Sequence, residues 1–128
     1  MKLLLDTHAF IWWDDDYNKL SSPVQSALLD PKNTIYLSLV SIWEMQIKVQ
    51  LKKLKFDRPL SDKITEQVDK NDLQLLPILD RHIYELSILP HHHRDPFDRL
   101  LIAQSRIEKM VFITQDNSIK KYDVQTLW

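Results

Sequence analysis

Short apolar runs alternate with longer stretches that carry apolar residues at helical spacing. A short, continuous apolar run is typical of a strand that is buried on both faces of a parallel sheet. We therefore predict strands at residues 2–5, 34–37, 73–78, 111–114 and 124–127. Helices are predicted over residues 9–13, 21–29, 41–54, 61–71, 80–89, 95–110 and 117–121. This alternation indicates an α/β fold, an α/β/α sandwich with a central, mostly parallel sheet.

Polar residues at the edges of these segments predict where the helices begin and end. Ser21-Ser22-Pro23 combines an N-cap with a proline near the first helical position, and Asp95-Pro96 opens a later helix in the same way. Ser41 is predicted to cap the long helix that follows it. The acidic run Asp14-Asp15-Asp16 ends the first helix.

The composition narrows the possible functions. Residues 1–128, of which 44% are hydrophobic, are predicted to form one domain, and the net charge of −1 gives no overall nucleic-acid signature. The absence of cysteine excludes disulfides and thiolate chemistry, and the absence of glycine excludes a P-loop and a Gly-rich dinucleotide loop. No stretch approaches the ~20 apolar residues of a membrane span, so we expect a cytoplasmic protein without a membrane partner.

Four carboxylates stand where a predicted strand ends or a predicted helix begins. Asp6 follows the first strand and Asp116 closes the fourth, while Glu44 and Asp98 lie in the first turns of helices. Ligands of an open parallel sheet bind beyond the carboxyl ends of its strands, so we expect these acids at one rim. Converging carboxylates repel each other unless a cation neutralises them, and oxygen ligands favour Mg²⁺ or Mn²⁺. The pattern predicts metal-assisted phosphodiester chemistry.

Glu44 also has two structural interpretations. Ser41 and Glu44 match a capping box, in which the glutamate side chain reaches back to the serine amide. Glu44 also stands four residues before Lys48, the favourable orientation for an ion pair on a helix. Taken alone, the sequence does not separate these roles from metal binding.

The four aspartates after strands and at helix starts differ in how well a purely structural role explains each of them. Asp95 is a natural N-cap before a proline, and this interpretation is favoured over a metal-binding role. Asp98 complements the dipole of the same helix, although a carboxylate in the first turn can also face a ligand. Asp116 can cap the short helix after it. Asp6 has no obvious structural partner in the sequence.

Several stretches then occur together in a characteristic order and spacing. The most specific is Asp-Pro-Phe-Asp-Arg-Leu-Leu-Ile-Ala-Gln at residues 95–104. The others are Leu4-Leu5-Asp6-Thr7-His8, Ser41-Ile42-Trp43-Glu44 with Lys48, His91 to Arg94, Thr114-Gln115-Asp116 and Leu127-Trp128. Over its whole length the chain resembles the PIN-domain nucleases, and closely the VapC-type toxins of bacterial toxin–antitoxin pairs. It departs from them at Glu108-Lys109-Met110, where relatives often carry glycine.

The resemblance implies a metal-dependent endoribonuclease that acts as the toxin of a type II toxin–antitoxin pair. The family's catalytic and metal-binding acids match Asp6, Glu44, Asp98 and Asp116, with the last completing the set. One or two Mg²⁺ or Mn²⁺ ions would lower the pKa of a bound water and neutralise phosphate charge. Cleavage would leave a 5′-phosphate and a 3′-hydroxyl.

Weaker signals concern the substrate and the partners. Residues that can contact RNA beside the acids are Thr7, Lys48, Arg94, Asp95, Arg99 and Thr114. The positive run from Lys52 to Arg58 is favoured as a solvated helix face, and His91-His92-His93 as an RNA contact or an exposed loop rather than a metal site. The resemblance implies three partners: a cognate antitoxin, an RNA substrate and a second copy in a homodimer.

Two other classes of function stay open at this point. One is a catalytically silent protein-binding module on a PIN-like fold, against which the intact set of acids argues. The other is a Mg²⁺-dependent phosphoryl-transfer domain, which would require a second aspartate soon after Asp6, where Thr7-His8 stands.

Overall fold

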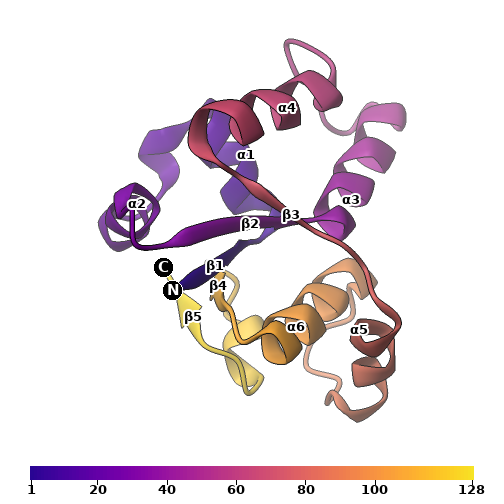
Figure 1. The fold of residues 1–128 in the computed structure, drawn as a ribbon. Coiled ribbons are helices and arrows are strands. Elements are labelled where there is room, and N and C mark those ends of the chain that lie inside the picture. The colour runs from indigo at the N-terminus through magenta and orange to yellow at the C-terminus, as the bar shows by residue number, and fades with distance from the viewer.

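The computed structural model describes residues 1–128 and contains one five-stranded sheet (Figure 1). Its strands are β1 (Lys2–Leu5), β2 (Thr34–Ser38), β3 (Gln74–Leu76), β4 (Val111–Ile113) and β5 (Thr126–Leu127). They lie in the order β3-β2-β1-β4-β5, and every neighbouring pair is parallel. All five predicted strands are present, although β3 and β5 are shorter than expected.

Helices cover both faces of this sheet, which confirms the predicted α/β/α sandwich. They are α1 (Thr7–Asp15), α2 (Ser22–Leu29), α3 (Leu39–Gln50), α4 (Leu60–Asn71), α5 (Asp80–Glu85) and α6 (Pro96–Glu108). Short 3₁₀ turns form at η1 (Tyr17–Lys19), η2 (Leu86–Ile88) and η3 (Ile119–Lys121). In Figure 1, α1 and α4 lie on one side of the strands, and α5 and α6 on the other. No helix is both long and apolar enough to cross a membrane.

The central strand β1 contributes to a separate core on each face of the sheet. Leu3 and Leu5 belong to a cluster that includes Phe10 of α1, whereas Leu4 belongs to a second cluster that includes Leu101 of α6. All three leucines of β1 are fully buried. Successive side chains of a strand point to opposite faces, so a continuously apolar strand is what two covered faces require.

The direction in which successive strands are added to the sheet reverses beside β1. From β1 the chain moves outward to β2 and then β3, and afterwards returns to form β4 on the other side of β1. Connections that leave adjacent strands in opposite directions open a crevice at their carboxyl ends, where ligands of α/β sheets bind. Asp6 directly follows β1, and Asp116 stands shortly after β4.

The prediction that Ser41 caps α3 is wrong. Strand β2 passes into the helix without a loop, so its last residue, Ser38, is the N-cap and accepts a hydrogen bond from the Val40 amide at 3.0 Å. Ser41 is buried inside the helix. The helix also ends at Gln50 rather than Leu54. Shortly after that point, Lys52 adopts a left-handed backbone conformation.

Candidate metal centre

A cleft of about 350 Å³ opens where β1 and β4 end. All four acids that the sequence singled out line it, namely Asp6, Glu44, Asp98 and Asp116. Three of the weaker candidates lie there too: Thr7, Lys48 and Asp95. The rest of the lining is His8, Trp12, Gln115 and Trp128. Carboxylates from four distant parts of the chain therefore face one small volume.

Asp6 has the structural partner that the sequence did not reveal. Its Oδ1 accepts a hydrogen bond from the Ala9 amide at 2.7 Å and so caps α1. Its own amide donates to the Ile113 carbonyl at 3.1 Å, which ties the end of β1 to β4. Burial raises the pKa of Asp6, and hydrogen bonds from the Thr114 hydroxyl and the Ala9 amide only partly offset this. Capping thus accounts for one oxygen and leaves a buried carboxylate at the cleft.

Glu44 lies on the buried side of α3 and is held at both oxygens. The Thr7 hydroxyl donates to its Oε1 at 2.7 Å, and Lys48 Nζ donates to its Oε2 at 2.9 Å. The predicted Glu44–Lys48 ion pair is confirmed, whereas the capping box with Ser41 is wrong because Glu44 stands beyond the first turn of α3. The Thr7 and Ser41 hydroxyl oxygens lie 3.1 Å apart. Because the Thr7 hydrogen goes to Glu44, the Ser41 hydroxyl donates to Thr7, so α1 positions this part of α3.

Asp95 and Asp98 share the first turn of α6 and have different roles. The Oδ1 of Asp95 accepts from the Phe97 amide at 2.8 Å and the Asp98 amide at 3.3 Å, so the N-cap interpretation is confirmed. Burial and the neighbouring charge of Asp95 raise the pKa of Asp98 to about 7, against a smaller opposing effect of His93. The Asp98 carboxyl therefore keeps its proton to a higher pH than an ordinary aspartate does, unless a cation binds beside it.

Asp116 follows β4 and is fixed by the turn after it. Its Oδ1 accepts from the Ser118 amide at 2.8 Å, and its amide donates to the Thr114 hydroxyl at 3.1 Å. Burial opposes ionisation, but hydrogen bonds from His93 and the Ser118 amide outweigh it and lower the pKa of Asp116. Thr114 is fully buried and supports Asp6 and Asp116 from below rather than lining the cleft.

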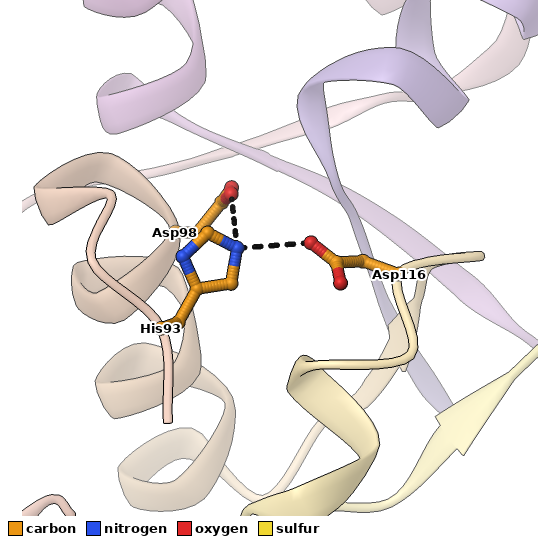
Figure 2. Close-up of side chains that lie close together, drawn as sticks. All are labelled: His93, Asp98 and Asp116. Atoms are coloured by element: carbon orange, nitrogen blue, oxygen red, sulfur yellow. Dashed lines mark hydrogen bonds and ion pairs between the residues drawn. The ribbon is translucent and has the colours of Figure 1, made fainter. Parts of the chain in front are cut away.

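Sequence reasoning missed His93, which contacts two of the acids (Figure 2). Its Nε2 lies 3.1 Å from Asp98 Oδ2 and 2.9 Å from Asp116 Oδ2. The expectation that the histidine run is an exposed loop is wrong for this member, whose side chain is 15% exposed. The available signal was its place two residues before the cap Asp95, whose amide donates to His93 Nδ1 at 3.0 Å.

The arginines near the third acid do not face the cleft. Arg99 donates to the Pro90 carbonyl at 2.8 Å and the Tyr122 hydroxyl at 3.2 Å, so it holds the preceding loop. Arg94 is exposed and lines a separate cavity of about 630 Å³ with Arg99 and His93.

The basic run from Lys52 to Arg58 forms no helix face, because α3 has already ended. It lies instead around another cavity of about 400 Å³, lined also by Phe56 and Leu60. This cavity shares no lining residue with the acidic cleft. Arg58 forms an ion pair with Glu66 of α4.

The donor set of the cleft fits a divalent cation. Carboxylate oxygens are the ligands that Mg²⁺ and Mn²⁺ prefer. One carboxylate oxygen of Asp98 and one of Asp116 lie within 4.8 Å of each other, and His93 stands beside both. The raised pKa values of Asp6 and Asp98 show that the chain's own cations do not fully compensate the buried negative charge. An added cation would supply that compensation.

The PIN domain family model matches residues 3–125, and the chain belongs to this family. PIN domains are generally nucleases that use a divalent metal. No curated protein matches the sequence closely enough to serve as a relative.

Solved structures resemble the fold over nearly the whole chain. VapBC2 from Rickettsia felis, bound to a DNA fragment from its promoter, matches with a TM-score of 0.72 and 15% identity over 99% of this chain and 98% of that one. DNA-bound VapBC from Salmonella typhimurium matches with a TM-score of 0.68 and 10% identity, over 99% of this chain and 97% of that one. VapBC-5 from Mycobacterium tuberculosis, of the VapBC family of toxin–antitoxin systems, matches with a TM-score of 0.58 and 17% identity, over 94% of this chain and 89% of that one. At sequence identities this low, these matches establish a shared fold and nothing more.

Proposed function

We propose that this protein is a metal-dependent endoribonuclease and the toxin of a type II toxin–antitoxin pair. The observation that carries the proposal is the meeting of Asp6, Glu44, Asp98 and Asp116 in one cleft of a PIN domain. The cleft contains no cysteine or serine, and its one hydroxyl, that of Thr7, is buried and donates to Glu44, so the chemistry of its lining favours hydrolysis by water.

The four acids would hold Mg²⁺ or Mn²⁺, which when bound lowers the pKa of a water ligand and neutralises phosphate oxygens. The chain's own part is to fix those acids. Thr7 and Lys48 hold the two oxygens of Glu44, and the Ala9 amide holds one oxygen of Asp6. Acids oriented before the substrate arrives need little rearrangement when charge develops on the phosphate.

Basic and aromatic side chains around the acids would position the RNA. Lys48 is 39% exposed while its ammonium touches Glu44, so it can reach a phosphate at the mouth of the cleft. Trp12 lines the same cleft and packs edge-to-face on Trp128 at 5.6 Å, a surface on which a base can stack. Arg94 is exposed beyond His93 and can bind a phosphate further along the strand.

The structural neighbours support an antitoxin partner, and exposed apolar side chains offer a surface for it and for a second copy in a homodimer. Several neighbours are toxin–antitoxin complexes of the VapBC type. Trp43 on α3 is 56% exposed and packs edge-to-face on Phe97, and Tyr84 on α5 is 69% exposed. By contrast, Trp12 and Trp13 pack against the core. With an antitoxin and an RNA target as partners, the location that we propose for this activity is the cytoplasm.

Cleavage of RNA by the purified, antitoxin-free protein tests the proposal. We expect cleavage of total RNA with Mg²⁺ or Mn²⁺, loss of cleavage in EDTA, and a decrease of at least ~100-fold in Asp6→Asn. Asp62→Asn is the matched control, because Asp62 is an exposed acid in the first turn of α4. Fragments should carry 5′-phosphates.

Two results would contradict the proposal. Cleavage that persists in EDTA, or equally in Asp6→Asn, would show that the acidic cleft is not the active site. Failure of the protein to bind Mn²⁺ and to cleave any RNA offered would favour a catalytically silent binding module instead.

A further inference from the structure

His93 contacts two of the acids at the cleft and has no role in the proposed function. It comes from the loop before α6, and its Nε2 lies between Asp98 Oδ2 at 3.1 Å and Asp116 Oδ2 at 2.9 Å (Figure 2). The two carboxylates belong to different parts of the chain, the first turn of α6 and the segment after β4. His93 is therefore the contact that joins them.

The hydrogen bond at the other ring nitrogen determines how His93 can interact with these acids. The Asp95 amide donates to Nδ1 at 3.0 Å, so Nδ1 presents a lone pair and carries no hydrogen. The hydrogen of the neutral ring is then on Nε2, which faces the carboxylates. A ring nitrogen that carries a hydrogen has no lone pair for a metal ion. In this arrangement His93 donates a hydrogen bond to Asp116, lies 3.1 Å from Asp98, and is not itself a ligand.

The loop that carries His93 is held by hydrogen bonds to Tyr122, which Arg99 of α6 also contacts. The Tyr122 hydroxyl accepts from the amides of His92 at 3.0 Å and His93 at 2.9 Å. Arg99 donates to the same hydroxyl at 3.2 Å and so connects it to α6. The His93 ring is thus fixed at its backbone and at Nδ1, and only Nε2 is directed at the cleft.

We propose that His93 is a positioning residue that holds the Asp98 and Asp116 carboxylates for a divalent cation through its Nε2–H group, without ligating that cation. The proposal rests on the metal site proposed above. Partners of this kind orient ligating carboxylates, and their loss typically costs about 10–100-fold in metal affinity or activity.

Titration of the full-length protein with Mn²⁺ in a calorimeter tests the proposal without using activity as the readout. We expect His93→Ala to bind Mn²⁺ about 10–100-fold more weakly than the wild type. His93→Gln should recover most of that loss, because its amide N–H can donate to the same carboxylates. His92→Ala is the matched control, and thermal unfolding of each variant verifies that it is folded.

Electron spin echo spectroscopy of the bound Mn²⁺ separates a positioning residue from a ligand. We expect no directly bonded imidazole nitrogen in the wild type. A directly bonded nitrogen that disappears in His93→Ala would overturn the proposal and make His93 a ligand. Unchanged affinity in a folded His93→Ala would overturn it as well and leave the metal site intact. Absence of Mn²⁺ binding in the wild type would instead refute both this proposal and the metal-dependent function.

Discussion

The four acids of the cleft differ in how easily each carries a negative charge. Burial raises the pKa of Asp6 and of Asp98, whereas hydrogen bonds from His93 and the Ser118 amide lower that of Asp116 despite its burial. Without a cation, the folded protein therefore contains carboxylates that it holds at an electrostatic cost. A site of this kind gains stability from the cation that it binds.

Asp98→Asn is expected to stabilise the metal-free protein at pH 8. The pKa of Asp98 is raised to about 7 in the folded state, so this state binds the proton more tightly than the unfolded state does. The stability linked to that proton is lost as the pH rises from about 4, the unfolded pKa, to about 7. Asparagine avoids the loss and should increase the free energy of unfolding at pH 8 by about 1–3 kcal/mol.

Urea unfolding in EDTA at pH 5 and pH 8 measures this effect. The advantage of Asp98→Asn should be larger at pH 8 than at pH 5, while the exposed Asp62→Asn should show little change at either pH. An Asp98→Asn variant that is less stable than the wild type at pH 8 would show that Asp98 is charged and well compensated in the folded protein.

The candidate residues were predictable from the sequence to the extent that they follow strands or begin helices. Asp6 and Asp116 stand out because an acid after an apolar run is visible locally. His93 does not stand out, since it lies among three adjacent histidines and its two carboxylate contacts come from 5 and 23 residues away along the chain. Only the folded loop reveals which of the three histidines faces the cleft.

At the scale of elements, the order of strands and helices was predictable and several boundaries were not. The chain has no glycine, so helices end at residues that adopt left-handed backbone conformations less readily. Lys52, Asp72 and Lys109 have φ values of 57°, 54° and 55°. Ser38 was missed as a cap because the direct passage from β2 into α3 is a tertiary feature.

A cluster of buried ion pairs connects α4 to α1. Lys63 of α4 lies with Nζ 2.7 Å from Asp14 Oδ2 and 2.7 Å from Asp15 Oδ1, and the side chain of Lys63 is only 2% exposed. Asp14 is 5% exposed. These partners are about 50 residues apart in the sequence, so the acidic run at the end of α1 was predictable only as the end of a helix.

Lys63→Met is expected to lower the free energy of unfolding by about 3–5 kcal/mol, because it leaves Asp14 buried without its counter-charge. Lys70→Met is the matched control on the same helix. Lys70 is 69% exposed and pairs with Glu66, so its loss should cost no more than ~1 kcal/mol. Chemical denaturation measures both. Equal effects of the two substitutions would show that the cluster does not contribute to stability.

For the whole molecule, the central fact is the strand order β3-β2-β1-β4-β5. It places β4 beside β1 and so brings together acids from residues 6, 44, 98 and 116. The fold class was predictable because strands and helices alternate, but the order of strands within the sheet is not written in any local pattern. With a net charge of −1, the molecule concentrates its functional charge locally in the cleft.

Diffraction from crystals soaked in Mn²⁺ tests the central claim most directly, because anomalous scattering locates the ion without any assumption about the substrate. We expect an anomalous peak among the carboxylates of the four acids Asp6, Glu44, Asp98 and Asp116, and no peak there in Asp6→Asn crystals treated in the same way. A peak elsewhere on the molecule, or none in the cleft at saturating Mn²⁺, would contradict the account of the four acids as one metal centre.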